Sequence, residues 1–379
     1  MLKLGIENID NYLHIFKNKK VGLITNHTGL DKQLKSTIDI LNEKVNLVAL
    51  FAPEHGIRGD LEAGVKLETY TDEVTSLPVY SLYGETRKPT KEMLENIDVL
   101  CFDIQDVGAR FYTYIYTMAY GMMAASENNI EFVVFDRPNP LGGKKVEGNI
   151  LDTKYRSFVG YYPITQRHGL TVGELAKLFN EEFKINSKLH VIPLVNWQRE
   201  MEFSDTKLPW ILPSPNLPTV ESTYVYLATC YFEGTNVSEG RGTTKPFLFF
   251  GAPWFKNKDV INKLNEFNFE GVLFREAYFT PTFSKHKDEF CKGVELVVTN
   301  KDAFSPVIVG MAIIKIVEEL HDEFEYRGPY RSDGQPMINL LVGDNFIRDN
   351  TLSFDEIKLR FEKDQKEFIK MKGKYHIYD

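Results

Sequence analysis

The stretch VLCFDIQDVGARFYTYIYT, from Val99 to Thr117, contains the pattern that decides the fold. Its first part, Val99 to Ile104, is a short continuous apolar run, and Gln105 to Gly108 form a polar loop. A helix-patterned segment then runs from Tyr112 to Ser126. Continuous apolar runs of this length are typical of strands that are buried on both faces of a parallel sheet. The stretch therefore predicts one strand–loop–helix unit of an α/β fold.

The same order recurs through the first half of the chain. A second helical pattern covers Leu34 to Leu41. Three further apolar runs each end in a polar loop: Val21 to Ile24 before Thr25–Gly29, Asn46 to Phe51 before Ala52–Gly56, and Phe132 to Phe135 before Asp136–Pro140. Strands that alternate with helices in this way predict a doubly wound parallel sheet. In such sheets the loops at the carboxyl ends of the strands form the crevice where ligands bind.

The length of 379 residues is more than one hydrophobic core usually serves, so we expect two domains. Four prolines are concentrated between Trp197 and Thr219: Pro209, Pro213, Pro215 and Pro218. So many prolines exclude a helix or a central strand and indicate a crossing between domains. We place the boundary near residue 204, with domains of residues 1–204 and 205–379.

The second half shows no strict alternation of strands and helices. Strand-like and helical runs mix there: Tyr224 to Tyr231, Phe247 to Phe250 and Val294 to Val298 read as strands, and Pro306 to Leu320 and Phe354 to Met371 as helices. This mixture predicts a smaller α+β domain.

Composition excludes several classes of protein. Hydrophobic residues make up 43% and charged residues 26%, and no apolar run approaches the ~20 residues that span a bilayer, so we expect no membrane insertion. A net charge of −8 without a basic block argues against a nucleic-acid partner. The N-terminus MLKLGIENID has no leader pattern, which predicts a cytoplasmic protein as written, or a secreted or wall-associated one if a leader was removed.

Common catalytic motifs are missing from the sequence. It contains no GxSxG, Walker GxxxxGK[ST], HExxH or GxGxxG pattern, which argues against serine hydrolases, P-loop enzymes and zincins. Cys101, Cys230 and Cys291 are isolated, so they predict buried thiols and neither a disulfide framework nor a CxxC metal site.

Glu54 is the first candidate for chemistry, because it directly follows an apolar run. Apolar neighbours such as Phe51 and Pro53 favour a protonated carboxyl, and a protonated carboxyl can act as a general acid. The structural alternative is a loop-capping glutamate paired with Arg58.

The segment FEGTNVSEGRGTTKPF, from Phe232 to Phe247, is the second candidate. It combines Asn236, Glu239 and Arg241 with glycines that allow a close approach of the backbone to a ligand. A plain turn is the alternative, although a turn does not require so many directional polar groups.

Other candidates lie in loops that the fold directs to the same edge. Arg110 precedes a helix and suits a carboxylate, while Tyr112 and Tyr114 suit a sugar ring or serve as core. Prolines hold Arg137 and Asn139 in a rigid loop. His168 stands just before the expected helix N-cap Thr171, with Glu174 as the capping-box partner, and is either an acid–base group, a metal ligand or a structural histidine.

Six long motifs occur together and in order: PEHG, GARFYTYIYT, DRPNPLGG, RHGLTVGELA, PSPNLPT and FEGTNVSEGRGTTKPF. In this the chain resembles the NamZ family of exo-β-N-acetylmuramidases. The resemblance implies a Rossmann-like N-terminal domain, a smaller C-terminal domain and an active site in the cleft between them. It also implies release of terminal N-acetylmuramic acid from the non-reducing ends of peptidoglycan fragments.

The resemblance assigns the catalytic role to the glutamate of PEHG, Glu54. For Glu239 we infer the role of a second carboxylate, with the 2-acetamido group of the substrate as the alternative nucleophile. The lactyl carboxylate of muramic acid calls for a guanidinium, for which we consider three arginines: Arg110, Arg137 and Arg241. The predicted substrate-binding set is completed by His55, Tyr112, Tyr114, Asn139, His168 and Asn236. We expect no cofactor.

Two other classes of function stay open from the residues alone. One is a wall-sugar binding protein without turnover. The other is a metal-dependent hydrolase built on His27, His55, Asp136 and His168, although their spacing is not diagnostic of a ligand set. The oligomeric state is not readable from the sequence.

Overall fold

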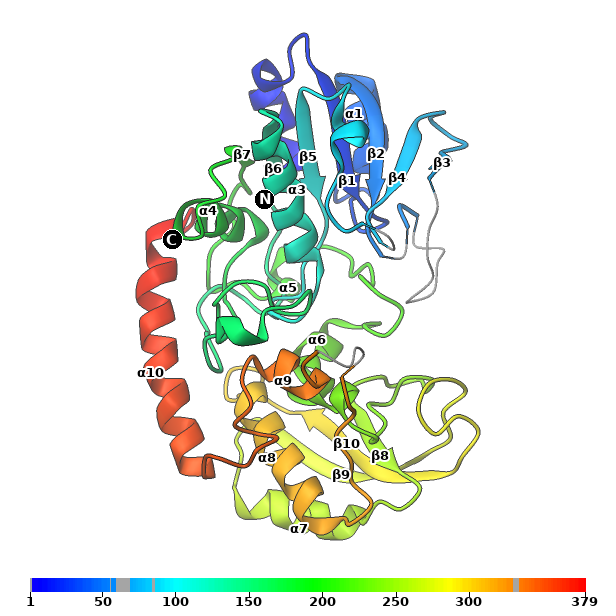
Figure 1. The fold of residues 1–379 in the computed structure, drawn as a ribbon, viewed down its shortest axis with the longest axis vertical. Helices are drawn as coiled ribbons and strands as arrows, with labels where there is room; N and C mark the ends of the chain where they lie inside the picture. Colours follow the sequence, from blue (N-terminus) through cyan, green and yellow to red (C-terminus); the bar gives the residue numbers. More distant parts are fainter. Residues whose placement is uncertain (1, 55, 59–68, 84–85, 330–333) are drawn as a thin grey trace.

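The computed structural model describes residues 2–54, 56–58, 69–83, 86–329 and 334–379. Its N-terminal unit is built on a seven-stranded sheet with the strand order β3-β4-β2-β1-β5-β6-β7 (Figure 1). The strands are β1 (Lys20–Thr25), β2 (Asn46–Ala52), β3 (Tyr70–Thr71), β4 (Pro78–Ser81), β5 (Val99–Asp103), β6 (Glu131–Phe135) and β7 (Lys188–Ile192). All neighbours are parallel except β3 and β4, which confirms the predicted α/β class.

The direction of winding changes between β1 and β5. From β1 the chain first builds outward through β2, and later returns to place β5 on the other side of β1. The loops that follow these two strands meet, because the backbone N–H of Gln105 donates to Oγ1 of Thr28 at 3.0 Å. A doubly wound sheet forms its ligand crevice at such a switch point. The polar loops are thus gathered at one edge.

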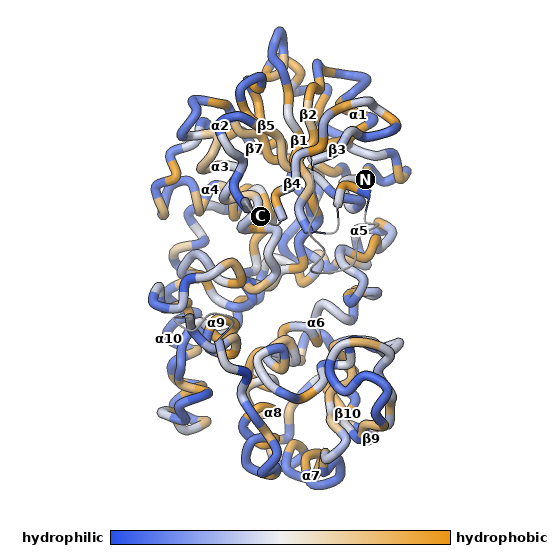
Figure 2. The backbone as a smooth tube through the Cα atoms, turned by 45° about the vertical axis from the view of Figure 1, so that its right-hand side comes forward, coloured by the Kyte–Doolittle hydropathy of each residue, from blue (hydrophilic) through white to orange (hydrophobic). Residues whose placement is uncertain are grey.

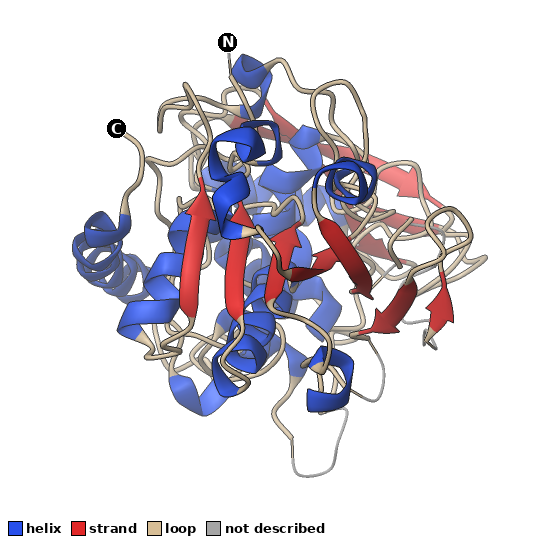
Figure 3. Cartoon of the chain, turned by 90° about the horizontal axis from the view of Figure 1, so that it is seen from above, coloured by secondary structure: helices blue, strands red, loops and turns tan. Residues whose placement is uncertain are grey.

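Helices cover both faces of this sheet (Figure 3). The side chains of β5 alternate between them: Leu100 and Phe102 belong to the core under α3 and α4, and Val99 and Cys101 to the core under the 3₁₀ helix η1 and α1. The bounds are η1 (Ile6–Ile15), α1 (Thr37–Lys44), α2 (Lys91–Leu94), α3 (Tyr114–Glu127), η2 (Thr153–Tyr155), α4 (Val172–Glu182) and α5 (Phe203–Thr206). In Figure 2 the hydrophobic colour concentrates in the strands and the hydrophilic colour in the outer loops.

The helix expected after Thr171 forms as predicted. The Thr171 side chain accepts from the backbone N–H of Glu174, and the Glu174 carboxylate accepts from the N–H of Thr171 at 3.1 Å. This reciprocal capping box fixes the start of α4 and the loop that precedes it.

The C-terminal unit is a three-stranded antiparallel sheet, β8-β10-β9, with helices packed against it. Its elements are α6 (Val220–Thr229), η3 (Cys230–Gly234), β8 (Phe249–Ala252), α7 (Asn257–Glu266), β9 (Val272–Phe279), β10 (Cys291–Val298), α8 (Pro306–Leu320), α9 (Met337–Val342), α10 (Phe354–Lys372) and η4 (Gly373–Tyr375). The smaller α+β architecture is therefore confirmed.

One element was predicted wrongly in this unit. The run from Tyr224 to Tyr231 is helical and not a strand, since it forms most of α6 and the start of η3. Thr219 and Ser222 form a capping box that begins the helix. All residues from Ser222 to Thr229 are buried, so the run lacks the polar face that would reveal a helical period.

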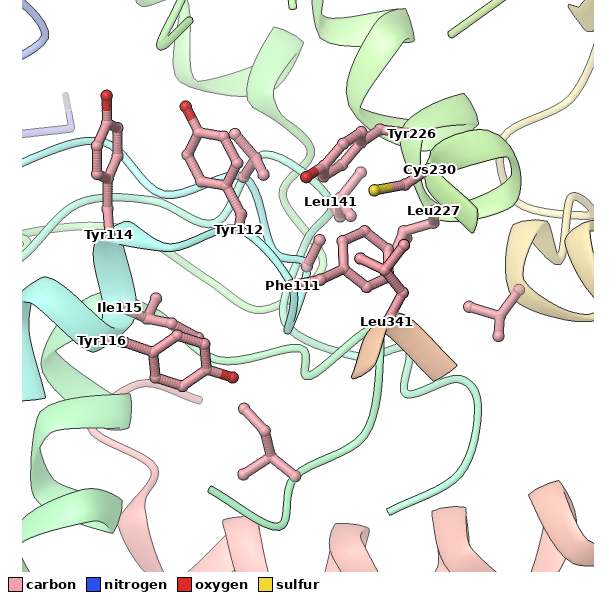
Figure 4. Close-up of a cluster of buried hydrophobic side chains, with 14 of the residues drawn as sticks. Phe111, Tyr112, Tyr114, Ile115, Tyr116, Leu141, Tyr226, Leu227, Cys230 and Leu341 are labelled. Carbon is pink, nitrogen blue, oxygen red and sulfur yellow. The ribbon is translucent and has the colours of Figure 1, made fainter. Parts of the chain in front are cut away.

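Buried side chains join the two units into one core (Figure 4). Phe111 of the N-terminal unit packs edge-on against Tyr226 of α6, with ring centroids 5.1 Å apart. The last helix also connects the units, because α10 begins in the C-terminal unit and ends beside the N-terminal sheet (Figure 1). At that end Nζ of Lys372 donates to the carbonyls of Gly143 and Gly169, both at 2.8 Å.

Within the described residues, no helix has the length and apolar character needed to cross a membrane. Cys101, Cys230 and Cys291 are buried free thiols, as the sequence indicated.

Candidate active site

A cavity of about 650 Å³ lies between the two units. This volume is in the range that accommodates a small ligand. Both units contribute to its wall: Glu54, Arg87, Tyr112 and Phe158 come from the N-terminal unit, and Tyr226, Glu233, Arg241 and Phe247 from the C-terminal unit. The loop after β2 and the segment Phe232–Phe247 therefore converge, although they are far apart in the chain.

Glu54 lies in the turn that follows β2 and contributes to the cavity wall. Its backbone carbonyl is 3.4 Å from the Tyr114 hydroxyl, which also lies 3.2 Å from the carbonyl of Pro213. Tyr114 thus connects the Glu54 turn to the proline-rich crossing. Arg58, the alternative structural partner of Glu54, donates to Asp72 at 2.7 and 3.1 Å. His55 lies outside the described residues.

A chain of four charged groups begins in the opposite wall and continues behind it. Arg241 donates to Glu233 at 2.7 Å and forms an ion pair with Glu239 at 3.1 Å. Lys285 donates to the second oxygen of Glu239 at 2.7 Å. Of the two carboxylates, Glu233 contributes to the cavity wall, with a side chain that is 25% exposed, whereas that of Glu239 is 3% exposed.

Glu239 therefore lies behind the cavity wall and not in it. Burial alone raises the pKa of its carboxyl, but the charges of Lys285 and Arg241 outweigh burial and hold the pKa below its usual value. The carboxylate is ionised and occupied on both oxygens. Arg241 and Lys285 bind it from both sides, so it does not contribute to the cavity wall, where the sequence analysis expected it.

The glycines of this segment shape its turn. Gly240 and Gly242 have φ angles of 78° and 81°, which are accessible to glycine at little cost. A Cβ atom at Gly242 would lie 2.6 Å from the carbonyl oxygen of Phe283. These glycines allow the backbone to turn so that Arg241 returns to the cavity.

Aromatic rings form much of the remaining wall. Tyr226 packs edge-on against Tyr112, with centroids 6.1 Å apart, and against Phe247 at 4.7 Å. Burial raises the pKa of Tyr112 and Tyr226, so both hydroxyls stay protonated. Figure 4 shows Tyr112 and Tyr114 side by side at the start of α3, with Tyr226 facing them from α6. These rings are largely buried, and Tyr112 and Tyr226 present only part of their surface to the cavity.

Arg110 does not reach the cavity. Its side chain is fully buried and donates to four carbonyls, those of Asn149, Ile164, Leu341 and Val342, at 2.7–3.0 Å. Burial lowers its pKa to about 10, so it is charged at neutral pH. The guanidinium joins the two units and does not face a ligand.

Arg137 and Asn139 are also buried away from this cavity wall. Arg137 forms a two-point ion pair with Asp103, at 2.5 and 3.0 Å. Asn139 donates to the carbonyl of Leu170 at 3.0 Å and accepts from the N–H of Leu141 at 2.9 Å. Both side chains hold the loops at the sheet edge together.

His168 and Asn236 make structural contacts as well. Nδ1 of His168 accepts from the N–H of Leu170 at 3.2 Å, so the ring proton resides on Nε2, 3.2 Å from Asp106. The Asn236 side chain bridges the backbone at Glu323 and Glu325, at 2.7 and 3.0 Å.

Of the predicted side chains, the cavity brings together Glu54, Tyr112 and Arg241.

Comparison with known families then identifies the kind of protein. Models described as exo-beta-N-acetylmuramidase NamZ match the chain twice, the N-terminal part at residues 21–221 and the C-terminal part at residues 224–378. The chain belongs to the NamZ family. This confirms the family that the six motifs indicated.

A relative of known name covers the whole chain. Peptidoglycan beta-N-acetylmuramidase NamZ of Bacillus subtilis (strain 168) is 52% identical over 384 residues, which include 100% of this chain and 91% of the relative.

Two solved structures of DUF1343 family proteins from Bacteroides fragilis NCTC 9343 share the fold. One has a TM-score of 0.91 at 39% identity and the other 0.80 at 34%, and each comparison covers 100% of this chain and 99% of the other. The architecture of this NamZ family member is therefore common to these proteins over the full length.

Three of the four residues of the alternative metal site are described in this NamZ fold, and His27, Asp136 and His168 each bind other groups of the protein. Nε2 of His27 contacts the carbonyl of Leu212 at 2.7 Å, while the Asp136 carboxylate accepts from Thr171 and from the N–H of Gly173, both at 2.8 Å. In the part of the chain that the structure describes, no group of three or more histidine, cysteine or acidic side chains is placed to hold a metal ion.

Four residues of the cavity wall had no role assigned from the sequence. Glu233 lies inside a NamZ motif, but the sequence analysis assigned the second carboxylate to Glu239 of the same motif. Tyr226 was hidden by the wrong strand assignment, and Arg87 and Phe158 lie outside every motif. The one feature of the sequence that could have indicated Glu233 is its position eight residues before Arg241, in the same motif.

Proposed function

We propose that this chain is an exo-acting β-N-acetylmuramidase that releases N-acetylmuramic acid from the non-reducing ends of peptidoglycan fragments. The observation that carries the proposal is the interdomain cavity, where Glu54 stands in one wall and the Glu233–Arg241 pair in the other. Membership of the NamZ family and the B. subtilis relative, which is named as a peptidoglycan β-N-acetylmuramidase, support the same activity.

Glu54 serves as the general acid in this proposal. Its carboxyl proton passes to the glycosidic oxygen while the bond from C1 to that oxygen breaks and its electron pair stays on the oxygen. Water then adds to C1, and the proton that the water loses returns to Glu54. Tyr114 acts through Glu54 as a positioning residue, because its hydroxyl lies next to the Glu54 carbonyl.

Glu233 provides the second carboxylate. Positive charge develops at C1 as the leaving group departs, and a carboxylate in the cavity wall stabilises that charge. The ion pair with Arg241 fixes the Glu233 side chain, and Glu239 and Lys285 in turn fix Arg241. In this arrangement Glu239 is a positioning residue.

The first test is the variant Glu54→Gln, assayed with a chromogenic β-N-acetylmuramide. We expect kcat to fall by about 100-fold or more, because glutamine has no proton to donate to the leaving oxygen. The dissociation constant of N-acetylmuramic acid should change little, since the amide keeps the size of the carboxyl.

The exposed glutamate Glu43 provides a matched control on the same domain. Its side chain is 61% exposed and pairs with Lys35 at the surface, so Glu43→Gln should retain full turnover. Near-normal turnover of Glu54→Gln would place the acid elsewhere. Saturable binding without product in the wild-type protein would identify a sugar-binding protein.

A further inference from the structure

The cavity wall contains two guanidinium groups with different surroundings. Arg241 is held by Glu233 and Glu239 and is also stacked over the Phe247 ring, with its Cζ 5.1 Å from the centroid. Two carboxylates already neutralise its charge, and their attraction raises its pKa although burial opposes this. A carboxylate from a ligand would therefore meet a guanidinium whose charge is already balanced by two carboxylates, bound at Nη2 and Nε.

Arg87 is different. It is exposed, and its Cζ lies 4.1 Å from the centroid of the Phe158 ring. Among the residues that the structure describes, no carboxylate forms an ion pair with it. A guanidinium stacked on a ring keeps its N–H groups at the edge, where they fit the two oxygens of a carboxylate.

The platform under Arg87 is itself supported. Phe158 stacks on Tyr120 of α3, with centroids 5.9 Å apart and an interplanar angle of 7°. Tyr161 packs edge-on against Tyr120 at 5.3 Å. Because these rings hold Phe158, they also limit the positions open to the Arg87 guanidinium. The Arg87 side chain therefore loses less conformational entropy when a ligand binds.

The charge of the substrate requires such a group. N-acetylmuramic acid carries a lactyl carboxylate, whereas the cavity wall already contains Glu54 and Glu233 and the whole chain has a net charge of −8. Like charges oppose its entry unless a cation meets the carboxylate. Arg87 is the guanidinium in the wall whose charge no carboxylate neutralises within the described part of the chain.

The geometry points to Arg87, stacked on Phe158, as the residue that binds the lactyl carboxylate and so selects N-acetylmuramic acid over sugars without that group. This inference rests on the proposed function, because it takes its ligand from it. It replaces Arg110, Arg137 and Arg241, because Arg110 binds backbone carbonyls and the other two bind carboxylates of the protein itself.

The decisive comparison uses two substrates, a chromogenic β-N-acetylmuramide and its lactyl methyl ester. The ester has the same shape but no negative charge. For Arg87→Gln we expect kcat/KM on the free acid to fall by about 10- to 100-fold, mainly through KM, while kcat/KM on the ester changes by less than about twofold. Arg87→Lys should recover only part of the loss, because an ammonium lacks the two-point fork.

Arg156 offers a matched control. It stacks over Tyr161 in the same aromatic group, at 4.9 Å, but does not contribute to the cavity wall. Arg156→Gln should leave both substrates unaffected. An equal loss on acid and ester in Arg87→Gln, or no loss on either, would overturn the inference.

Direct binding separates this inference from the proposed function. Calorimetric titration with free N-acetylmuramic acid and with N-acetylglucosamine needs no turnover. If the wild type cleaves neither substrate, the muramidase proposal fails, but weaker binding of muramic acid alone in Arg87→Gln would still support the role of Arg87. Equal affinities of wild type and variant for muramic acid would refute it.

Discussion

Two glutamates in one loop have opposite environments. Glu239 is buried between Arg241 and Lys285, whereas Glu233 pairs with Arg241 and reaches the cavity. Lys285 also donates to the carbonyls of Phe232 and Val237, at 2.5 and 2.8 Å. Glu239 thus supports the wall of the cavity, whereas Glu233, six positions earlier in the sequence, faces the cavity.

These environments predict that the two acids separate stability from turnover. Glu239→Gln leaves Lys285 without a charged partner, so we expect the free energy of unfolding to fall by about 3 kcal/mol or more. Glu233→Gln removes a partly exposed pair and should cost within about 1 kcal/mol, but it should lower kcat by about 100-fold. Urea denaturation and a chromogenic muramide assay measure the two quantities.

The reverse pattern would contradict this division. A stable Glu239→Gln protein with no turnover would mean that the buried carboxylate serves catalysis, directly or through Arg241, more than it serves stability. The Glu43→Gln variant again serves as the surface reference for both measurements.

At the scale of elements, the C-terminal segment docks on the start of α4. The Tyr378 hydroxyl donates to Asp136 at 2.5 Å, and the N–H of Ile377 donates to Glu174 at 2.9 Å. The N–H of Leu194 donates to the Tyr378 hydroxyl at 2.8 Å. Asp136, directly after β6, therefore accepts hydrogen bonds both from this segment and from the N-terminal turn of α4.

This docking makes stability depend on pH. Burial raises the pKa of Asp136 from its usual value near 4 to about 7, and Glu174 adds to that rise. The Asp136 carboxyl binds a proton more tightly in the native protein than in the unfolded chain. Its contribution to the free energy of unfolding is therefore complete below pH ~4 and is lost as pH rises through ~7. Asp136→Asn keeps an oxygen acceptor without the charge. The free energy of unfolding of this variant, relative to that of the wild type, should therefore rise between pH 4.5 and 8, by at most about 4 kcal/mol.

Urea denaturation of both proteins at the two pH values measures this double difference. His376 lies in the same C-terminal segment and also titrates, but it is present in both proteins. Its effect on the free energy of unfolding therefore cancels in the comparison. Asp355→Asn, at the exposed start of α10, should follow the wild type at each pH. Parallel pH profiles for wild type and Asp136→Asn would show that Asp136 does not titrate in this range.

The elements of the N-terminal unit that could be predicted have local signals, whereas β3, β4 and β7 were not predicted. Four short apolar runs became β1, β2, β5 and β6, with ends that shift by one residue at most. Thr171 and Glu174 marked the start of α4 by adjacent hydrogen-bonding groups. The run Tyr224–Tyr231 failed for the opposite reason, since a helix buried on all sides has no period that distinguishes it from a buried strand.

At the scale of the whole molecule, Arg110 joins the two units. Its Nη1 donates to carbonyls of the N-terminal unit, and its Nη2 to Leu341 and Val342, the last residues of α9. A cation suits the carbonyl end of a helix, so the charge is stabilised there without a carboxylate.

Arg110→Met should therefore weaken the whole fold. It removes four hydrogen bonds from buried carbonyls at the junction, and we expect the free energy of unfolding to fall by about 3 kcal/mol or more in urea. Arg348→Met at the surface, with a side chain that is 44% exposed, should cost less than about 0.5 kcal/mol. A similar small cost for Arg110→Met would show that the units do not depend on this contact.

The site could be predicted less completely than the fold. Motifs brought Glu54, Tyr112 and Arg241 to one cavity, because the ends of parallel strands and one loop of the other unit meet there. Polar residues in the same motifs, such as Arg137 and His168, bind partners within the protein, namely Asp103 and Asp106. Only three-dimensional contacts distinguish them from ligand-facing groups. Arg87 and Phe158 have no such motif, since stacking between distant side chains leaves no spacing in the sequence.

The return of α10 to the N-terminal sheet has a consequence for how wall fragments are sorted. The polypeptide passes between the units twice, once through the proline-rich crossing and once through this helix, so a hinge motion about one linker would strain the other. We therefore expect the cavity to be largely preformed, so that its dimensions limit the size of the fragments that enter.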